Sequence, residues 1–457
     1  MTNLAPAATE LESEARRRPG FDRPRRGRPP SRNEILRAGR LGGLDPELLA
    51  ERFGTPLFVY DLDVVSRQVA ELRAALPPAV ELAYAVKANP ALAVVAHLGS
   101  LELGADVSSG GELRVAVRAG VPADRIIITG PGKRDDELQL AVETGPRAIT
   151  VESRGELERL ERIAASTRRV APVLLRAAVP PEVSLERVRL VGDDGAGKFG
   201  MDRDDVRAAA RFAARSAHLE PVGIHAFGAS NVADVAALAM HAEWAADLAR
   251  EVAAGAGFRL RLIDIGGGLG IPYEPDDRVL DVAGLGRALA ALLDRLGGDP
   301  VTREARLLVE PGRYLVGPAG AYVSRVVDRK TVEERHVAVL DGGVHHVLRP
   351  VLVGQEHRIR NLAAPSASAS KSFPMTIAGP LCSGLDTLTS HAAMAVPDIG
   401  DLVAVLDVGA YGYTESMPFF LSHPVPAEVA IRGGRVELIR RRIEPDEWLA
   451  YQGVPDW

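Results

Sequence analysis

The chain has 457 residues, of which 46% are apolar and 25% charged, and its net charge is −6 from 55 basic and 61 acidic residues. This is ordinary globular composition, long enough for two domains or one large one, and its charge balance gives no reason to expect nucleic acid as a partner. Its one cysteine, Cys382, excludes an internal disulfide and a cysteine-based zinc cluster.

The sequence also lacks the signals of membrane insertion and export. No stretch approaches 18 uninterrupted apolar residues, and the N-terminus has no signal-peptide pattern. We therefore expect a cytoplasmic protein without a membrane partner. The lone cysteine is either a small buried apolar residue or a reactive thiol, and composition leaves both open.

The first forty residues differ from the rest of the chain. The stretch RRRPGFDRPRRGRPPSR is rich in arginine and proline and has few apolar residues. Such a segment cannot bury a core. Residues 1–40 are therefore predicted to be a disordered extension, with ordered chain beginning near residue 41.

From about residue 55 onward, short apolar stretches alternate with amphipathic ones. TPLFVYD, ELAYAVKA and RIIITG have the composition of strands, whereas VVSRQVAELRAAL has the apolar spacing of a helix. Strands that are apolar on both faces and separated by helices are typical of a parallel sheet covered by helices. Roughly eight such units over about 260 residues predict an α/β fold of the (β/α)₈ TIM-barrel type. A doubly wound sheet is the alternative.

After about residue 320 the pattern changes to strands with few helices between them. YVSRVVDRKTV, RHVAVLDGG and DLVAVLDVGAY are examples, and together they predict a mainly antiparallel β domain. We therefore expect a barrel from residues 62–320 and a β domain from residues 41–61 and 321–457. The low-complexity stretch 364–372, APSASASKS, is predicted to be a mobile loop in that β domain.

Several polar residues follow the predicted barrel strands. Lys87 ends LAYAVK, Arg176 ends VLLR, His225 lies near the end of GIHAF, Glu310 ends LLVE, and a glycine triplet follows LIDI. Each alone has an ordinary explanation, because a lysine there can be a surface residue and a glycine triplet is often a tight turn. Functional groups of a barrel, however, gather at the C-terminal ends of its strands. Together these residues indicate a site at that end.

Eight motifs occur along residues 45–450 in a characteristic order: YAVKAN, GADVSSGGEL, KFGM, IDIGGGLG, EPGR, RPVLVGQEH, GPLCSGLD and GAYG. As a set they resemble the fold-type III pyridoxal-phosphate decarboxylases that act on ornithine, lysine, arginine and diaminopimelate. The resemblance is nearest to diaminopimelate decarboxylase-like enzymes. It implies an alanine-racemase-like barrel that carries the cofactor, a C-terminal β domain, and a head-to-tail homodimer with shared active sites.

The resemblance implies roles for single residues. Lys87 would hold the cofactor aldehyde as an imine, with its pKa lowered by burial and neighbouring cations. Glu310 would keep the pyridine nitrogen protonated. Cys382 would reach in from the partner subunit and protonate Cα, and the pKa of a free thiol, about 8.5, suits that task. No metal is expected.

The cofactor phosphate and the distal end of the substrate have their own implied ligands. The phosphate ligands are the backbone of Gly266, Gly267 and Gly268 with Ser230, Tyr411 and Arg313. Arg313 and Arg349 match a pair that grips a distal carboxylate, a task that suits the planar guanidinium. Ser383 and Tyr411 are the further substrate-binding residues.

Three positions depart from the diaminopimelate enzymes. Phe227, in HAFGASN, stands where a histidine usually stacks on the cofactor ring, and an aromatic residue can still stack there. Ser383, in CSGLD, replaces the glutamate that meets the distal amino group, and Val353 replaces a tyrosine. The distal pocket is therefore predicted to keep its cations and lose its anion.

These departures leave the substrate open. Diaminopimelate is one candidate. The other is a specialised amino acid of natural-product or siderophore pathways, including a glutamyl group tethered to an acyl carrier protein. An amino-acid racemase has the same barrel and cofactor, but it needs a tyrosine base opposite Lys87, where this chain offers Cys382.

Overall fold

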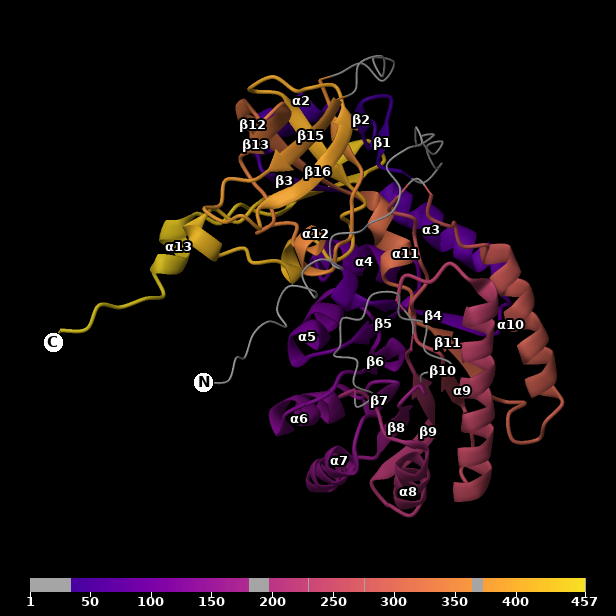
Figure 1. Cartoon of the computed structure of the whole chain (residues 1–457). Coiled ribbons are helices and arrows are strands. Elements are labelled where there is room, and N and C mark those ends of the chain that lie inside the picture. The colour runs from indigo at the N-terminus through magenta and orange to yellow at the C-terminus, as the bar shows by residue number, and fades with distance from the viewer. Residues whose placement is uncertain (1–33, 181–196, 229, 275, 364–372, 457) are drawn as a thin grey trace, which may run out of the picture.

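The computed structural model describes residues 34–180, 197–228, 230–274, 276–363 and 373–456. In Figure 1 these residues form a strand barrel surrounded by helices and, above it, a separate sheet domain. The site considered below lies where the two units meet.

The barrel is closed by parallel strands. In the described part of the chain, eight strands follow one another around it in the order β10, β11, β4, β5, β6, β7, β8, β9. The predicted TIM barrel is therefore confirmed, and the doubly wound alternative is wrong. The strand bounds are β4 (Val80–Ala85), β5 (Gly104–Val107), β6 (Ile126–Ile128), β7 (Ala148–Val151), β8 (Ala171–Ala177), β9 (Leu219–Ala226), β10 (Leu262–Asp264) and β11 (Arg306–Val309).

Helices cover the outside of the barrel (Figure 1). Several of these helices begin at a capping residue: Ser109 accepts from the Glu112 N–H at 3.1 Å, and Asp202 accepts from the Asp205 N–H at 2.8 Å. Within the described ranges, no helix is both long and apolar enough to cross a membrane. The helix bounds are α3 (Leu62–Ala75), α4 (Leu92–Ser100), α5 (Gly110–Arg118), α6 (Asp135–Thr144), α7 (Arg154–Ser166), α8 (Arg203–Ala213), α9 (Val235–Ala256) and α10 (Val282–Gly297).

The second unit is a sheet whose strands pair mostly antiparallel, as predicted. Its two parallel pairs are β3 with β18 and β13 with β15. Among the described residues, the short helices within this unit are α2 (Pro46–Phe53), α12 (Arg349–Leu352) and α13 (Pro445–Leu449). The strand bounds are β3 (Leu57–Asp61), β12 (Gly320–Val332), β13 (Arg335–Leu340), β14 (Ile359–Asn361), β15 (Phe373–Ala378), β16 (Thr387–Met394), β17 (Leu402–Leu406), β18 (Ala427–Arg432) and β19 (Arg435–Arg440).

The chain passes between the units twice. It leaves β3 directly into α3, whose first N–H groups donate to the Asp61 carboxylate, and it returns from β11 through α11 (Arg313–Val316) to β12. Because β3 pairs with β12 and β18, residues 57–61 belong to the sheet although they precede the barrel. The division into residues 62–320 and 41–61 with 321–457 stays our proposal, and these pairings support it.

The N-terminal prediction falls partly outside the described residues. Residues 1–33 lie there, and so does the predicted loop at 364–372. Residues 34–40 are described, and they include β1 (Leu36–Arg37) and the first residue of β2 (Arg40–Leu41). Glu34 is buried and accepts from Arg358 at 2.8 Å, so this short segment is attached to the β domain.

Close packing of α10 on α3 yields a stability prediction. A Cβ on the buried Gly286 would collide with the carbonyl oxygen of Ala75, whereas a Cβ on Gly297, in the same helix, would meet nothing. Gly286→Ala should therefore lower the melting temperature, because overpacking typically costs about 1–3 kcal/mol. Gly297→Ala should leave it unchanged or raise it, since alanine favours helix. Equal melting temperatures of the two variants would contradict this packing.

Candidate active site

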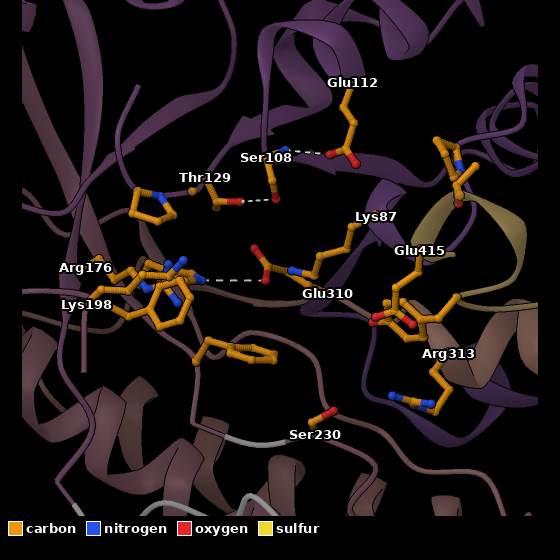
Figure 2. Close-up of a pocket in the computed structure, with 18 of the residues that line it drawn as sticks. Lys87, Ser108, Glu112, Thr129, Arg176, Lys198, Ser230, Glu310, Arg313 and Glu415 are labelled. Atoms are coloured by element: carbon orange, nitrogen blue, oxygen red, sulfur yellow. Dashed lines mark hydrogen bonds and ion pairs between the residues drawn. The ribbon is translucent and has the colours of Figure 1, made fainter. Parts of the chain in front are cut away.

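A cavity of about 570 Å³ opens at the C-terminal end of the barrel strands. Figure 2 shows residues that line it. Seven predicted site residues lie together in its wall: Lys87, Phe227, Ser230, Glu310, Arg313, Arg349 and Tyr411. Residues from the ends of several barrel strands and from loops of the β domain thus face one space. Its remaining lining residues are Pro90, Ser108, Glu112, Thr129, Gly130, Pro131, Arg176, Lys198, Phe199, His225, Thr414 and Glu415.

Lys87 is presented by a single turn, Val86–Ala88, directly after β4. Asn89 holds that turn, since its side-chain amide donates to the Gly409 carbonyl at 3.0 Å and its oxygen accepts from the Ala91 N–H at 3.0 Å. From the other side, the Tyr411 N–H donates to the Ala88 carbonyl at 2.7 Å. The GAYG loop of the β domain is therefore bonded directly to the lysine turn, and this contact joins the two units at the site.

Carboxylates surround the Lys87 ammonium. Its Nζ lies 3.5 Å from Oδ2 of the buried Asp106, whose other oxygen accepts from the Thr129 hydroxyl at 2.5 Å. Figure 2 shows Lys87 next to Glu310 at the centre of the cavity. The Lys87 side chain remains 39% exposed, so its amine is accessible from the cavity.

This arrangement corrects the prediction that the pKa of Lys87 is lowered. Burial does lower it, but the charges of Asp106 and Glu310 outweigh burial and raise the pKa of Lys87 above its ordinary value. Arg176, the cation that opposes them, has a smaller effect on the pKa of Lys87, and it is itself paired with Glu152 at 2.6 Å. The protein's own side chains thus keep Lys87 protonated.

Glu310 lies in a buried, charged part of the site. His225 Nε2 is 3.6 Å from Glu310 Oε2, and both side chains are buried. Burial favours the neutral acid, yet His225 and Lys87 together hold the pKa of Glu310 at about 2. In contrast, burial and the neighbouring Glu310 raise the pKa of Asp264 well above its ordinary value. Glu310 is therefore the ionised member of the pair.

Unsatisfied polar atoms indicate what this part of the cavity can hold. Among the described residues, Glu310 Oε1 and both ring nitrogens of His225 are buried without a hydrogen-bond partner. Buried polar groups normally have partners, so these atoms fit a polar group that enters the cavity. A protonated pyridine nitrogen would supply the partner that Glu310 Oε1 lacks, and Lys87 could hold the aldehyde of the same molecule.

Side chains in this part of the cavity could also bind a metal ion. Ligand atoms of His225, Asp264 and Glu310 lie within 4.8 Å of one another, and a set of imidazole and carboxylates can bind a divalent cation. However, the raised pKa of Asp264 favours its protonated form, which is a poor ligand. The Lys87 ammonium beside Glu310 also opposes a second cation. The residues therefore fit pyridoxal phosphate better than a metal.

The predicted phosphate ligands are only partly in the cavity wall. Ser230 and Tyr411 line it, but Gly266, Gly267 and Gly268 do not. The Gly266 N–H donates to Asp264 at 2.9 Å, and a Cβ on Gly267 would collide with the Glu310 carbonyl. The glycines thus allow β10 and β11 to end close together, while their phosphate role stays a prediction.

Two guanidinium groups flank the Tyr411 ring. Arg313 lies 4.7 Å and Arg349 lies 4.8 Å from its centroid. Arg349 is paired with a residue that sequence analysis missed, since its Nη1 donates to both carboxylate oxygens of Glu415 at 3.0 and 2.7 Å. The prediction that the distal pocket has no anion is therefore wrong. Glu415 follows no strand and belongs to no motif, so nothing in the sequence pointed to it.

Cys382 and Ser383 do not line the cavity of their own subunit. Cys382 is exposed on a tight turn that folds around the buried Asp386. One oxygen of Asp386 accepts from the Leu381 N–H at 2.7 Å, and the other accepts from the Val344 N–H at 2.8 Å. The turn therefore points the thiol outward. One protomer alone does not bring these two residues together with Lys87.

A comparison with protein families matches residues 62–317 to the pyridoxal-binding domain of the pyridoxal-dependent decarboxylases. The match covers the barrel described above, and it includes Lys87, His225, Asp264 and Glu310.

Similar proteins of known function include two kinds of decarboxylase. Diaminopimelate decarboxylase of Aquifex aeolicus is 33% identical over 401 residues, which are 88% of this chain and 92% of that protein. The L-glutamyl-[BtrI acyl-carrier protein] decarboxylase of Niallia circulans is 32% identical over 410 residues, covering 88% and 95%. The crystal structure of diaminopimelate decarboxylase from M. jannaschii superposes with a TM-score of 0.84 at 28% identity, over 93% of this chain and 98% of that one.

The charge environment of Lys87 can be tested directly. Asp106→Asn removes the negative charge that raises the pKa of Lys87 most, so this pKa should fall. Because the neutral amine is the reactive form, labelling of Lys87 in cofactor-stripped protein should begin at lower pH in the variant. Peptide mass mapping measures this, with the exposed Lys330 as internal reference. The same labelling profile for Lys87 in both proteins would contradict the assigned role of Asp106.

Proposed function

The chain belongs to the pyridoxal-dependent decarboxylases, and we propose that it removes the α-carboxylate of an amino acid with Lys87 and Glu310 of one subunit and Cys382 of a second. The observation that carries the proposal is the cavity itself. It places an accessible lysine amine next to a buried, ionised carboxylate at the C-terminal end of the barrel.

Pyridoxal phosphate, when bound, supplies an aldehyde that takes an amine and a protonated ring that accepts the electron pair left when carbon dioxide departs. Lys87 would hold the aldehyde carbon until the amino group of the substrate replaces it. Asp106 lies 3.5 Å from the Lys87 amine and can share its proton during that exchange. Glu310, with its low pKa, would hold the proton on the ring nitrogen.

The other groups around the cavity would orient the cofactor. Phe227 lies with its ring centroid 5.2 Å from the Lys87 amine, which suits an aromatic residue that stacks on the cofactor ring. Ser230 and Tyr411 line the cavity and would bind the phosphate, together with the backbone of Gly266–Gly268 and with Arg313. Tyr411 has φ of +55°, a strained value for a non-glycine residue that is common at functional sites.

Protonation at Cα needs a donor that the cavity of one subunit does not supply. We assign this step to Cys382 of a second copy. Its turn holds the thiol outward on the surface, where a neighbouring molecule can receive it. Ser383, the adjacent residue, would then face the substrate as well.

A homodimer with shared sites explains a group of exposed apolar side chains. They occur on the Cys382 turn, on α12 and on the loop that follows the cavity residues Thr414 and Glu415. Exposed apolar side chains in one region mark interaction sites, and a second copy that delivers Cys382 would cover them. The residues are Leu352, Leu385, Met417, Phe419, Phe420 and Leu421.

Two substrates follow from the relatives. One is diaminopimelate, which has a distal carboxylate and a distal ammonium. The other is a glutamyl group linked to an acyl carrier protein, whose distal end carries neither charge and whose use would add that carrier protein as a partner. The Glu415–Arg349 pair favours the second candidate. Arg349 is already paired with Glu415, so it is not free to bind the distal carboxylate of diaminopimelate.

The roles of Lys87 and Glu310 predict different losses. Lys87→Ala should lose the visible absorbance of the lysine-linked cofactor together with activity. Glu310→Gln should retain that absorbance and lose rate by about 10²-fold or more, because a neutral amide no longer holds the ring proton. Absorbance and carbon dioxide release are measured on the same samples. A wild-type rate in Glu310→Gln, or an unchanged spectrum in Lys87→Ala, would refute the assigned role of that residue.

The shared site predicts complementation between two impaired variants. The Cys382→Ala variant should keep the cofactor. It should deliver the proton to Cα slowly, or deliver it to a different atom. When Lys87→Ala and Cys382→Ala subunits are mixed and allowed to exchange, half of the dimers are mixed and each has one intact site of two. Activity should therefore recover to roughly a quarter of wild type.

The matched control for complementation is a mixture of Lys87→Ala and Glu310→Gln. Both residues lie in the cavity of the same subunit, so no mixed dimer has an intact site. Recovery in this control, or none in the Lys87→Ala and Cys382→Ala mixture, would contradict the contribution of Cys382 across an interface.

A further inference from the structure

The Arg349–Glu415 pair is a largely buried charge contact at the distal end of the cavity. The Arg349 side chain is 2% exposed and that of Glu415 is 27% exposed. Both carboxylate oxygens of Glu415 accept from Arg349 Nη1, at 3.0 and 2.7 Å. Figure 2 shows the Glu415 carboxylate inside the cavity, on the same side as Arg313. The guanidinium group is thus already neutralised by the protein.

Further contacts keep Arg349 in this position. Its Nε donates to Gln355 Oε1 at 3.1 Å, and the same oxygen accepts from Arg313 Nη1 at 3.3 Å. The Gln355 side-chain nitrogen lies 3.0 Å from His357 Nε2, and the other ring nitrogen of His357 lies 2.9 Å from the Leu406 carbonyl. Arg349 therefore has little freedom to turn toward another anion.

The backbone around Glu415 is also fixed. The Glu415 N–H donates to the Gly412 carbonyl at 3.2 Å, in the short helical turn Tyr413–Glu415. The hydroxyl of the next residue, Ser416, donates to the same carbonyl at 3.0 Å and accepts from the Leu348 N–H at 3.1 Å. These bonds connect the Glu415 loop to the start of α12, which carries Arg349. Glu415 is held against its partner before any substrate arrives.

From this geometry we propose that Glu415 is a specificity-determining residue that disfavours substrates with a distal carboxylate. A carboxylate at Arg349 would have to displace Glu415 from a buried arginine or lie beside it as a like charge, and burying a charge without a partner is costly. The second guanidinium group in the cavity, that of Arg313, is close enough to Glu415 to be affected by the same negative charge. A distal amide, ester or thioester has no such requirement. The enzyme therefore prefers amino acids whose distal end is uncharged. This inference rests on the proposed function, because it names the substrate class of the same site.

The test compares two ligands that differ only at one end. Glutarate has two carboxylates, whereas glutaramate, of the same shape, has a carboxamide in place of one. Calorimetric titration of cofactor-loaded protein gives the affinity ratio of the pair without any reaction. The corresponding amino acids, glutamate and glutamine in both enantiomers, give the same ratio as kcat/KM.

We expect wild type to bind glutaramate at least as well as glutarate. Glu415→Gln should shift the ratio toward glutarate by about tenfold or more, because it frees the arginine charge and keeps a hydrogen-bond acceptor. Glu415→Asp keeps the charge and should stay nearer to wild type. Glu356→Gln is the matched control, because it removes one negative charge from the neighbour of Gln355, a residue that does not line the cavity. This variant should leave the glutaramate-to-glutarate affinity ratio unchanged.

An unchanged ratio in Glu415→Gln, or no measurable glutarate binding to it, would overturn the proposal. So would an equal shift in Glu356→Gln. These results do not depend on turnover. A failure of the decarboxylase function would instead appear as absent carbon dioxide release while the binding ratio still shifts.

Discussion

The site depends on holding a lysine ammonium that faces the cavity beside buried carboxylates, at the end of a closed parallel barrel. Neighbouring strands each contribute one group: Lys87 follows β4, Asp106 lies in β5, and Asp264 and Glu310 come from the ends of β10 and β11. A barrel brings these strand ends into one ring, so the charges meet although they are far apart in sequence. Attraction between Lys87 and these carboxylates offsets the cost of burial, and repulsion between Glu310 and Asp264 leaves Glu310 as the ionised acid of that pair.

Strand periodicity predicted a barrel with a doubly wound sheet as the alternative, and the family resemblance favoured the barrel. Residues at strand ends predicted Lys87, His225 and Glu310 in one site. Their positions follow from a regular repeat. Glu415 could not be found in this way, because it lies in a loop whose path is determined by tertiary contacts with α12. The pKa of Lys87 was predicted in the wrong direction for a related reason. Which charges lie next to Lys87 depends on which strands are neighbours in the barrel, and these bring Asp106 and Glu310 close to it.

The two ends of the cavity are built differently. The end near Lys87 consists of strand ends and of a turn that Asn89 and Tyr411 hold by hydrogen bonds. The distal end consists of loops of the β domain, where Arg349, Gln355 and Glu415 form a network of side chains. Loops accept substitutions more readily than packed strands. We therefore expect substitutions in the loops of the β domain to change the choice of substrate more readily than substitutions at the strand ends of the barrel.

The central claim, loss of the α-carboxylate with a proton added at Cα, can be measured in one experiment. Cofactor-loaded protein is incubated in deuterated water with amino acids labelled at the α-carboxyl carbon. The panel contains diaminopimelate isomers, lysine, ornithine, arginine, glutamate and carrier-linked glutamate. The account predicts one labelled carbon dioxide for each amine formed, with one deuterium at Cα. Deuterium at Cα of an amino acid that keeps its carboxylate, without carbon dioxide, would contradict the account and indicate a racemase.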